Sequence, residues 1–407
     1  MAKIKKSQII LLMLMLGIIT GPVFDLISTY LSYSGAEFSR ATLVTRGFFI
    51  VLVIATALAV ATKRHIASLL ILFTPLFPMA IWYFLDLYSG KALFESIAFL
   101  TKILSLFALI TLFSLLRDKQ LNQINILIKA SLAIYMLCII AGAAFNIEMF
   151  ESYKTIERSG YKGIITAQNE ATGLVFISLL ISGFRISTNQ ATNLDKALFA
   201  ITAIASFLLG TKPGLILPIV VIAIIYIAEN GYIKSIPKII LATALFGALG
   251  FVIFSYIPAA KNALNMSLSY FLFQLDHYAN GNLVTLLLSG RDNKLDYAVE
   301  HYILQNPSYL LFGGYPVGGY VVEIDFIDLA MLFGLPIFAI YLRMVYLAFK
   351  GAETTQTARY YMLSFAGIIL LANTAGHIFT SALVIPYIAY FCTLKAHNKE
   401  SKAHLNV

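Results

Sequence analysis

The chain has 407 residues, of which 59% are hydrophobic and 12% are charged, and its net charge at neutral pH is +9. A soluble domain carries about 25% charged residues, so this composition excludes a soluble globular protein. Apolar runs of about 20 residues recur along the chain, which is the length of a membrane-spanning helix and too long for the alternating strands of a β-barrel. The sequence therefore predicts an all-α polytopic membrane protein.

We expect about twelve transmembrane helices, at residues 8–27, 41–61, 66–86, 92–115, 122–145, 168–186, 196–210, 215–230, 236–257, 326–346, 360–377 and 379–394. The first predicted helix follows Lys3, Lys5 and Lys6, and a signal peptide has the same order of a basic segment and an apolar run. Because no cleavage motif comes after the apolar run, we interpret it as a retained helix. The predicted regions are 1–257 with helices one to nine, a loop at 258–325, helices ten to twelve at 326–394, and a tail at 395–407.

The distribution of lysine and arginine predicts the orientation of these helices. With the N-terminus in the cytoplasm, most cations fall in cytoplasmic loops, as the positive-inside rule requires. Both termini are then cytoplasmic, and the loop at 258–325 is extracytoplasmic. Because membrane topology explains the positive charge, we expect no nucleic-acid partner. Cys138 and Cys392 lie in separate apolar spans, so we interpret them as packing residues.

The extracytoplasmic loop at 258–325 is the long polar interval of the chain, and Arg291 is its first candidate catalytic residue. Arg291 lies in Ser-Gly-Arg-Asp, directly before a helix-like run at 293–305. Arginine suits planar, bidentate contact with phosphate. The alternative is an ordinary surface ion pair with Asp292 or Asp296.

Glu323, Asp325 and Asp328 lie where this loop enters the tenth predicted helix. One reading makes one of these acids a general base, which needs hydrogen-bond reach to an acceptor hydroxyl; Glu323 and Asp325 are the candidate catalytic residues. A second makes E-x-D-x-x-D a divalent-cation site, and a third only places acids favourably at a helix N-terminus. We favour the base. His377, in the eleventh predicted helix, is a polar residue at membrane depth and therefore a candidate substrate-binding residue.

Two further outer segments carry candidate anion-binding residues. Lys212 lies in the tight turn 210–214, where a proline starts the next helix and free N–H groups favour an anion. The alternative is a lysine that snorkels to the membrane surface. Arg158 and Lys162 lie in the loop before the sixth predicted helix, and Asn169 opens that helix. These residues either bind an anion or are simply solvated.

Three cations lie inside predicted helices, where charge is costly and suggests a functional site. For Arg46 and Lys102 the alternative is a buried pair with an acid such as Asp86 or Glu95. Lys129 lies near a helix end, so we expect it to snorkel to the surface.

The order of these motifs resembles the bacterial O-antigen polymerase and O-antigen ligase superfamily over roughly residues 120–390. Ser289-Gly290-Arg291, followed by a helix, Asn-Pro and a glycine-rich turn, is similar to the S-G-R region of that family. Gly210-Thr211-Lys212 is similar to its Ser-Arg-small element, with lysine in place of arginine, and Ala167–Glu170 to its N-P-N segment without the proline. The chain lacks G-x-S-x-G, H-E-x-x-H and P-loop motifs, so we expect no nucleotide hydrolysis.

The resemblance implies a GT-C-like membrane glycosyltransferase in the bacterial inner membrane. It implies a polyprenyl-diphosphate-linked oligosaccharide as substrate, a chain-length regulator protein as a partner, contact with membrane lipid, and neither cofactor nor metal. Arg291 and Lys212 would hold the leaving diphosphate. We favour a polysaccharide polymerase, because the ligases have a histidine and an asparagine where this chain has Glu323–Asp325. The alternatives are the ligase and a lipid-linked oligosaccharide flippase, which is expected to show internal repeats.

Overall fold

The computed structural model describes residues 6–36, 41–152, 160–256, 283–350 and 354–403, together with residues 261, 265, 269 and 272. Most of these residues lie in helices, and none of them forms a sheet. Within them, eight helices are long and apolar enough to cross a membrane, so the protein is a multi-pass membrane protein, as its composition predicts. The eight spans are 6–33, 41–60, 65–84, 90–114, 118–145, 168–187, 212–230 and 232–252.

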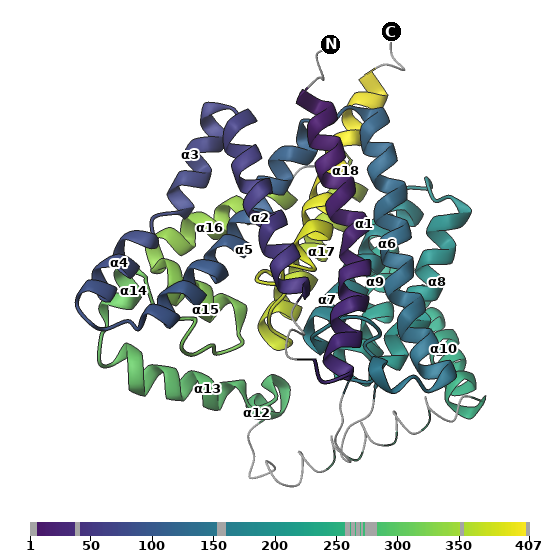
Figure 1. Ribbon diagram of the computed structural model, residues 1–407. Coiled ribbons are helices and arrows are strands. Elements are labelled where there is room, and N and C mark those ends of the chain that lie inside the picture. The colour runs from purple at the N-terminus through teal and green to yellow at the C-terminus, as the bar shows by residue number, and fades with distance from the viewer. Residues whose placement is uncertain are drawn as a thin grey trace.

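The helices follow one another with short connections over most of the chain (Figure 1). Their bounds are α1 (Lys6–Tyr33), α2 (Ala41–Val60), α3 (Lys63–Leu72), α4 (Leu76–Phe84), α5 (Gly90–Ser114), α6 (Asp118–Phe145), η1 (Glu148–Phe150), α7 (Gln168–Ser187), α8 (Asn193–Leu208), α9 (Lys212–Asn230), α10 (Tyr232–Tyr256), α12 (Leu283–Leu288), α13 (Arg291–Ala298), η2 (Val299–Ile303), α14 (Ser308–Phe312), α15 (Asp325–Phe333), α16 (Leu335–Phe349), α17 (Thr355–Thr374) and α18 (Ile385–Ala403).

Each of the twelve predicted segments is helical in whole or in part, but three of them are not continuous helices. The segment 66–86 divides into α3 and α4 before Pro75, which has no N–H for the helical hydrogen bond. The segment 326–346 divides into α15 and α16 at Gly334, whose φ of 72° is left-handed. The segment 379–394 becomes helical only at Ile385.

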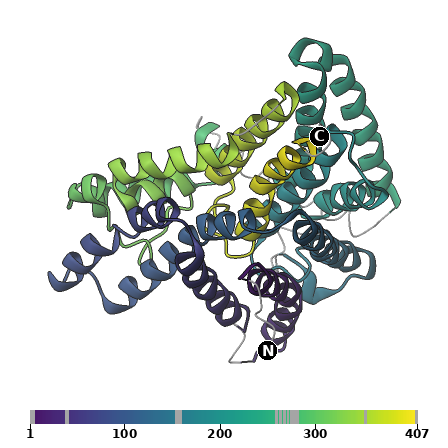
Figure 2. The same ribbon diagram turned by 90° about the horizontal axis from the view of Figure 1, so that it is seen from above.

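The helices differ greatly in how much of their surface lies inside the bundle. The most apolar windows of α7 and α5 are 83% and 72% buried, which makes these two helices central. The corresponding window of α10 is 12% buried, and α10 packs against α9 at the margin of the bundle. Seen from above, the purple and blue helices of the first half lie alongside the green and yellow helices of the second half (Figure 2).

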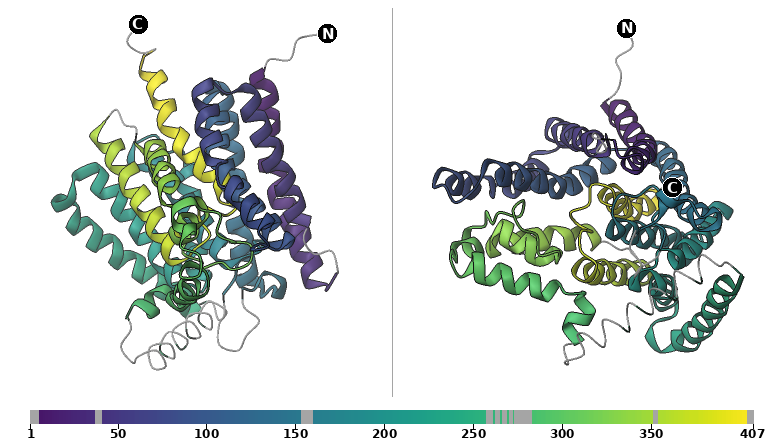
Figure 3. Two further views of the ribbon diagram at one scale, coloured as in Figure 1. Left: turned by 90° about the vertical axis from the view of Figure 1, so that its left-hand side faces the viewer. Right: turned by 60° about the horizontal axis from the view of Figure 1, so that its bottom comes forward.

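Different helices lie at the two ends of the bundle. The start of α1 and the end of α18 lie at one end, and α12 and α13 lie at the other (Figure 1). In that view α13 runs crosswise to α1 and α6, and a view with this end turned forward shows the green α13 alongside the light-green α15 and α16 (Figure 3). The first part of the predicted loop, from Pro258, lies mostly outside the described residues.

Candidate functional site

Arg291 is the first residue of α13 and is only 9% exposed. Gly290 turns the chain into the helix with a φ of 81°. The guanidinium donates from Nη1 to the carbonyl of Thr374, at 2.7 Å, and from Nη2 to that of Ala375, at 2.8 Å. The last carbonyls of a helix have no partner within it. Arg291 therefore binds the C-terminal end of α17 with most of its planar fork.

Glu323 connects Arg291 to a second cation. Its Oε2 lies 3.5 Å from the Nε of Arg291, and its Oε1 accepts a hydrogen bond of 2.6 Å from the Nζ of Lys294. Burial alone would raise the pKa of Glu323, but the hydrogen bond and charge of Lys294, together with the charge of Arg291, lower it below its ordinary value of 4.5. Glu323 is therefore ionised at neutral pH and is a weaker base than a free glutamate.

Asp325 organises the segment between α17 and α18. It is 1% exposed, and its two carboxylate oxygens accept the backbone N–H groups of His377, at 2.6 Å, and of Ile378 and Phe379, both at 2.8 Å. A carboxylate that accepts three N–H groups is held in one orientation. This geometry makes Asp325 an anchor for the backbone that carries His377.

Asp328 has a similar position one helical turn later. Its oxygens accept the N–H groups of Val322 and Glu323, at 2.9 and 3.0 Å. The carboxylates of Asp325 and Asp328 thus point to different backbone segments. Across the part of the chain that the structure describes, no three His, Cys, Asp or Glu side chains converge as a metal-ligand set. The geometry of E-x-D-x-x-D favours backbone capping over a divalent-cation site.

His377 lies beside this cluster in a left-handed conformation, with a φ of 60°. Its Nδ1 is 3.4 Å from the hydroxyl of Thr380, and its side chain is half-buried. The preceding Gly376 has no room for a side chain, since a Cβ there would lie 2.5 Å from the carbonyl oxygen of Glu323. This close contact brings Arg291, Glu323, Asp325 and His377 together from three separate segments.

The other predicted binding residues lie around the turn between α8 and α9. Lys212 begins α9 and is half-buried, and the hydroxyl of Thr211 caps the helix by accepting the N–H of Gly214 at 3.1 Å. The first residue of α7, Gln168, donates to the carbonyl of Leu209 at 2.6 Å. The start of α7 is thereby attached to the turn that carries Lys212.

Two of the remaining candidate binding residues, Lys162 and Asn169, lie just before α7 and at its start. Lys162 donates from Nζ to the carbonyl of Thr166 at 2.6 Å, which closes a local turn before α7. Asn169 is half-buried in the first turn of α7. Arg158 lies outside the described residues.

The segment 375–384 connects the two groups of candidates. The hydroxyl of Ser381 donates to Oε1 of Glu170, in α7, at 2.7 Å. A Cβ on Gly173, also in α7, would lie 2.6 Å from Cδ1 of Ile378, so the segment packs directly against this helix. The candidates thus form two neighbouring groups on either side of one backbone segment, rather than a single cluster.

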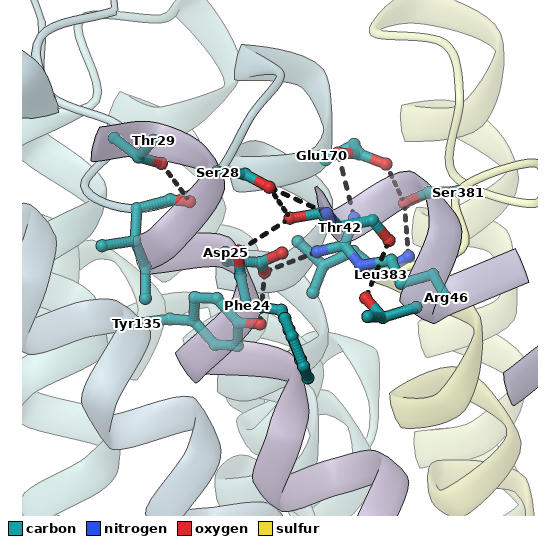
Figure 4. A network of polar contacts seen from close by, with 12 residues as sticks. Phe24, Asp25, Ser28, Thr29, Thr42, Arg46, Tyr135, Glu170, Ser381 and Leu383 are labelled. Atoms are coloured by element: carbon teal, nitrogen blue, oxygen red, sulfur yellow. Dashed lines mark hydrogen bonds and ion pairs between the residues drawn. The ribbon is translucent and has the colours of Figure 1, made fainter. Parts of the chain in front are cut away.

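Arg46 has partners that differ from those expected. Its Nη2 lies 2.5 Å from a carboxylate oxygen of Asp25, and its Nη1 lies 3.9 Å from Glu170 (Figure 4). The predicted partners Asp86 and Glu95 are therefore wrong for Arg46. The reason is tertiary, because α1 and α2 pack together and place Asp25 opposite Arg46.

Asp25 is the residue of this network that the sequence analysis missed. It is fully buried in α1 and accepts a hydrogen bond of 2.6 Å from the hydroxyl of Tyr135 (Figure 4). Asp25 could have been found in the sequence as an acidic residue inside an apolar span, because a charged residue inside a predicted helix was also what identified Arg46 as a candidate. Lys102, in α5, is half-buried in the same region, where the carboxylate of Glu170 attracts its charge and the guanidinium of Arg46 repels it.

Lys129 was expected to snorkel to the membrane surface, and that prediction is wrong. Lys129 is 3% exposed, and its Nζ lies 2.5 Å from Asp195, which is itself fully buried. Asp195 also caps α8 by accepting the N–H of Thr192 at 2.9 Å. The neighbouring packing of α6 and α8 brings the two charges together.

No protein-family model matches the chain, and neither a curated protein nor a solved structure shows significant similarity to it.

Proposed function

We propose that this protein is a polysaccharide polymerase of the bacterial cytoplasmic membrane. It would transfer a growing glycan from a polyprenyl diphosphate to a lipid-linked repeat unit at the outer face. About twelve helices would cross the membrane, with both termini in the cytoplasm. One observation carries the proposal: Arg291, Lys294, Glu323 and His377 gather at the end of the bundle that contains α12 and α13, opposite the start of α1.

The cations of this cluster suit a departing diphosphate. Negative charge develops on the leaving oxygen as the bond to the anomeric carbon breaks, and fixed cations stabilise that charge. The two Nη atoms of Arg291 are bound to carbonyls, whereas the side chain of Lys294 is 41% exposed. We therefore assign direct contact with the diphosphate to Lys294, and positioning together with long-range charge to Arg291.

Glu323 is the better placed of the two proposed bases. Its side chain is 31% exposed, whereas Asp325 is buried with both oxygens bound to backbone N–H groups. In the proposed reaction an acceptor hydroxyl attacks the anomeric carbon, Glu323 takes the hydroxyl proton, and the diphosphate leaves with the electrons of the broken bond. Binding of the diphosphate to Lys294 would remove a partner of Glu323 and raise its basicity when a base is needed.

The first test substitutes these cations in cells that make the polysaccharide. Loss of the charged hydrogen bond from Lys294 to the diphosphate, about 1.5–3 kcal/mol, corresponds to a fall in rate of about tenfold to hundredfold. Lysine cannot reproduce the fork with which Arg291 holds the end of α17, so Arg291→Lys displaces the segment that carries His377. Arg291→Lys and Lys294→Gln should both shorten the glycan chains at matched membrane levels. Lys119→Gln, exposed at the opposite end of the bundle, is the control and should leave chain length unchanged.

Deletion of the gene separates this proposal from its rivals. Loss of a polymerase leaves single repeat units attached to the lipid carrier at the outer face. Loss of a ligase leaves long chains that are not attached to lipid A core, and loss of a flippase leaves repeat units at the cytoplasmic face. Normal chain length in the Arg291→Lys and Lys294→Gln variants would contradict the proposed site.

A further inference from the structure

A continuous run of aromatic ring contacts extends from α4 to the π-helical turn η2 and does not belong to the site described above. Ring centroids in this run are between 3.9 and 6.0 Å apart from one neighbour to the next. The members, in order of contact, are Trp82, Tyr309, Tyr315, Tyr302, Tyr320, Tyr297 and His301.

The inner end of this run is buried and the outer end reaches the surface. Tyr309 and Tyr315 are 4% and 0% exposed, whereas Tyr297 is 43% exposed. His301 is also exposed and stacks on Tyr297, with ring centroids 3.9 Å apart and an angle of 17° between the planes. We call the four outer rings the aromatic platform; they are Tyr297, His301, Tyr302 and Tyr320.

A local irregularity of the helix produces this arrangement. After α13 the chain makes the π-helical turn η2, in which the N–H of Leu304 donates to the carbonyl of Val299 at 2.9 Å. Such turns are rare and recur at functional sites. The turn directs Tyr302 toward Tyr320, while His301 stays stacked on Tyr297.

The platform adjoins the proposed diphosphate site. The hydroxyl of Tyr320 donates to the carbonyl of Lys294 at 3.2 Å, and the side chain of Lys294 is the one bound to Glu323. The platform is therefore attached to the backbone of the residue whose ammonium group binds Glu323. Exposed Glu300 and Asn293 supply polar groups on the same helical segment.

We propose that the aromatic platform binds a pyranose ring of the lipid-linked glycan, an inference that rests on the proposed function. The C–H face of a pyranose packs flat against an aromatic ring, and its hydroxyl groups bond with the surrounding polar atoms. Tyrosine offers a large contact area with few rotatable bonds and a polar end. Tyrosines that only anchor a protein at the membrane interface need no stacking on one another.

The experiment uses the full chain in lipid nanodiscs. The probe is the repeat-unit oligosaccharide released from its lipid by mild acid, so that it carries neither diphosphate nor lipid. Binding is measured by isothermal titration calorimetry, because Trp82, the single tryptophan of the chain, contacts Tyr309 at the buried end of the run, away from the platform. The unsubstituted protein should bind the oligosaccharide, and Tyr297→Ala should weaken binding about tenfold, which is about 1.4 kcal/mol.

Two variants make the test specific. Tyr297→Phe keeps the ring and should bind within about twofold of the unsubstituted protein. Tyr256→Ala removes a more exposed tyrosine, 81% accessible at the end of α10, and should have no effect. Absence of binding by the unsubstituted protein, or equal binding by Tyr297→Ala, would overturn the platform. A fall in membrane insertion without any change in binding would make Tyr297 an interface anchor and would also overturn it.

This design separates failure of the platform from failure of the proposed function. If the platform is wrong, Arg291→Lys still shortens the glycan while Tyr297→Ala binds the oligosaccharide normally. If the polymerase is wrong, Arg291→Lys leaves chain length unchanged while Tyr297→Ala still weakens binding, and the platform then serves a different reaction on the same sugar.

Discussion

At the scale of single residues, two opposite charges hold one backbone segment. Arg291 donates to the carbonyls of Thr374 and Ala375, at the end of α17. Asp325 accepts the N–H groups that come directly afterwards, beginning with that of His377. Free carbonyls at a helix end attract a cation, and N–H groups that follow attract an anion. The pair thereby fixes the backbone on which His377 is presented.

This arrangement predicts that Asp325 contributes mainly to stability. Asp325→Asn would replace one acceptor oxygen with an NH₂ group facing backbone donors, which leaves buried N–H groups unsatisfied at about 1–3 kcal/mol each. We expect a lower midpoint of thermal unfolding in detergent. Asp296→Asn, on the exposed face of α13, is the control and should unfold as the unsubstituted protein does. Unchanged stability with lost polymerisation would instead make Asp325 the base.

The pKa of Glu323 predicts a pH dependence of stability. Because the cations lower its pKa in the folded state, Glu323 contributes stability that is fully present above its ordinary pKa of 4.5 and is lost as the pH falls through the folded value. The difference in unfolding midpoint between the unsubstituted protein and Glu323→Gln should be constant from about pH 8 to about pH 5 and shrink below about pH 4.5. Glu300→Gln, at an exposed glutamate of the neighbouring turn η2, is the matched control. A difference that already shrinks near neutral pH would mean that the pKa is raised.

At the scale of helices, buried ion pairs connect neighbours that apolar packing alone would not align. Arg46 and Asp25 join α2 to α1, and Lys129 and Asp195 join α6 to α8. Glu170 and Ser381 then join the central helix α7 to the segment before α18. A buried charge is costly unless it is paired, so each pair favours the alignment of its two helices that brings the charges together.

Lys129 and Asp195 allow this to be measured. Lys129→Met should cost about 3–5 kcal/mol, because it leaves Asp195 buried without a counter-charge. Adding Asp195→Asn removes that charge while keeping an acceptor for the cap of α8, and should recover most of the loss. The measurement is unfolding of the purified variants in detergent. A cost below about 1 kcal/mol for Lys129→Met would mean that the lysine behaves as an exposed side chain.

At the scale of the whole molecule, the cluster of Arg291 and Glu323 lies at the end of the bundle away from the start of α1 and the end of α18. If the proposed function holds, the side from which the lipid-linked substrate arrives is therefore tied to the location of the termini. The positive-inside rule predicts that the termini are cytoplasmic, which would put the cluster at the outer face.

Cysteine labelling tests this orientation. Cys138 and Cys392 are first replaced by alanine, and single cysteines are introduced at Ser289 and Ser308, on either side of α13. Both should react with a membrane-impermeant thiol reagent in intact cells. Gln190→Cys, exposed between α7 and α8, should react only after permeabilisation. The reverse pattern would invert the protein and remove the proposed site from the outer face.

The sequence alone determined that this is a helical membrane protein and where its helices lie. This is possible because each spanning segment must satisfy its own backbone hydrogen bonds, so that length and hydropathy are local properties. The helix after Ser289 and the break near Asn306 were likewise visible in local composition. Pro75 and Gly334 divided two predicted helices, because one residue can override the hydropathy of its surroundings.

Only the tertiary structure decided which charges meet. The sequence marked Arg46 and Lys129 as unusual, but their partners depend on which helices pack together and at what depth. Arg291 and His377 were candidates in separate segments, and the close approach of Gly376 to Glu323 is what joins them. The aromatic platform was also invisible, because its rings come from three elements and one of these is a π-helical turn. The hydropathy of a segment predicts how deep in the membrane a residue lies. Which residues it contacts depends on how distant segments pack together, and a short stretch of sequence does not determine that packing.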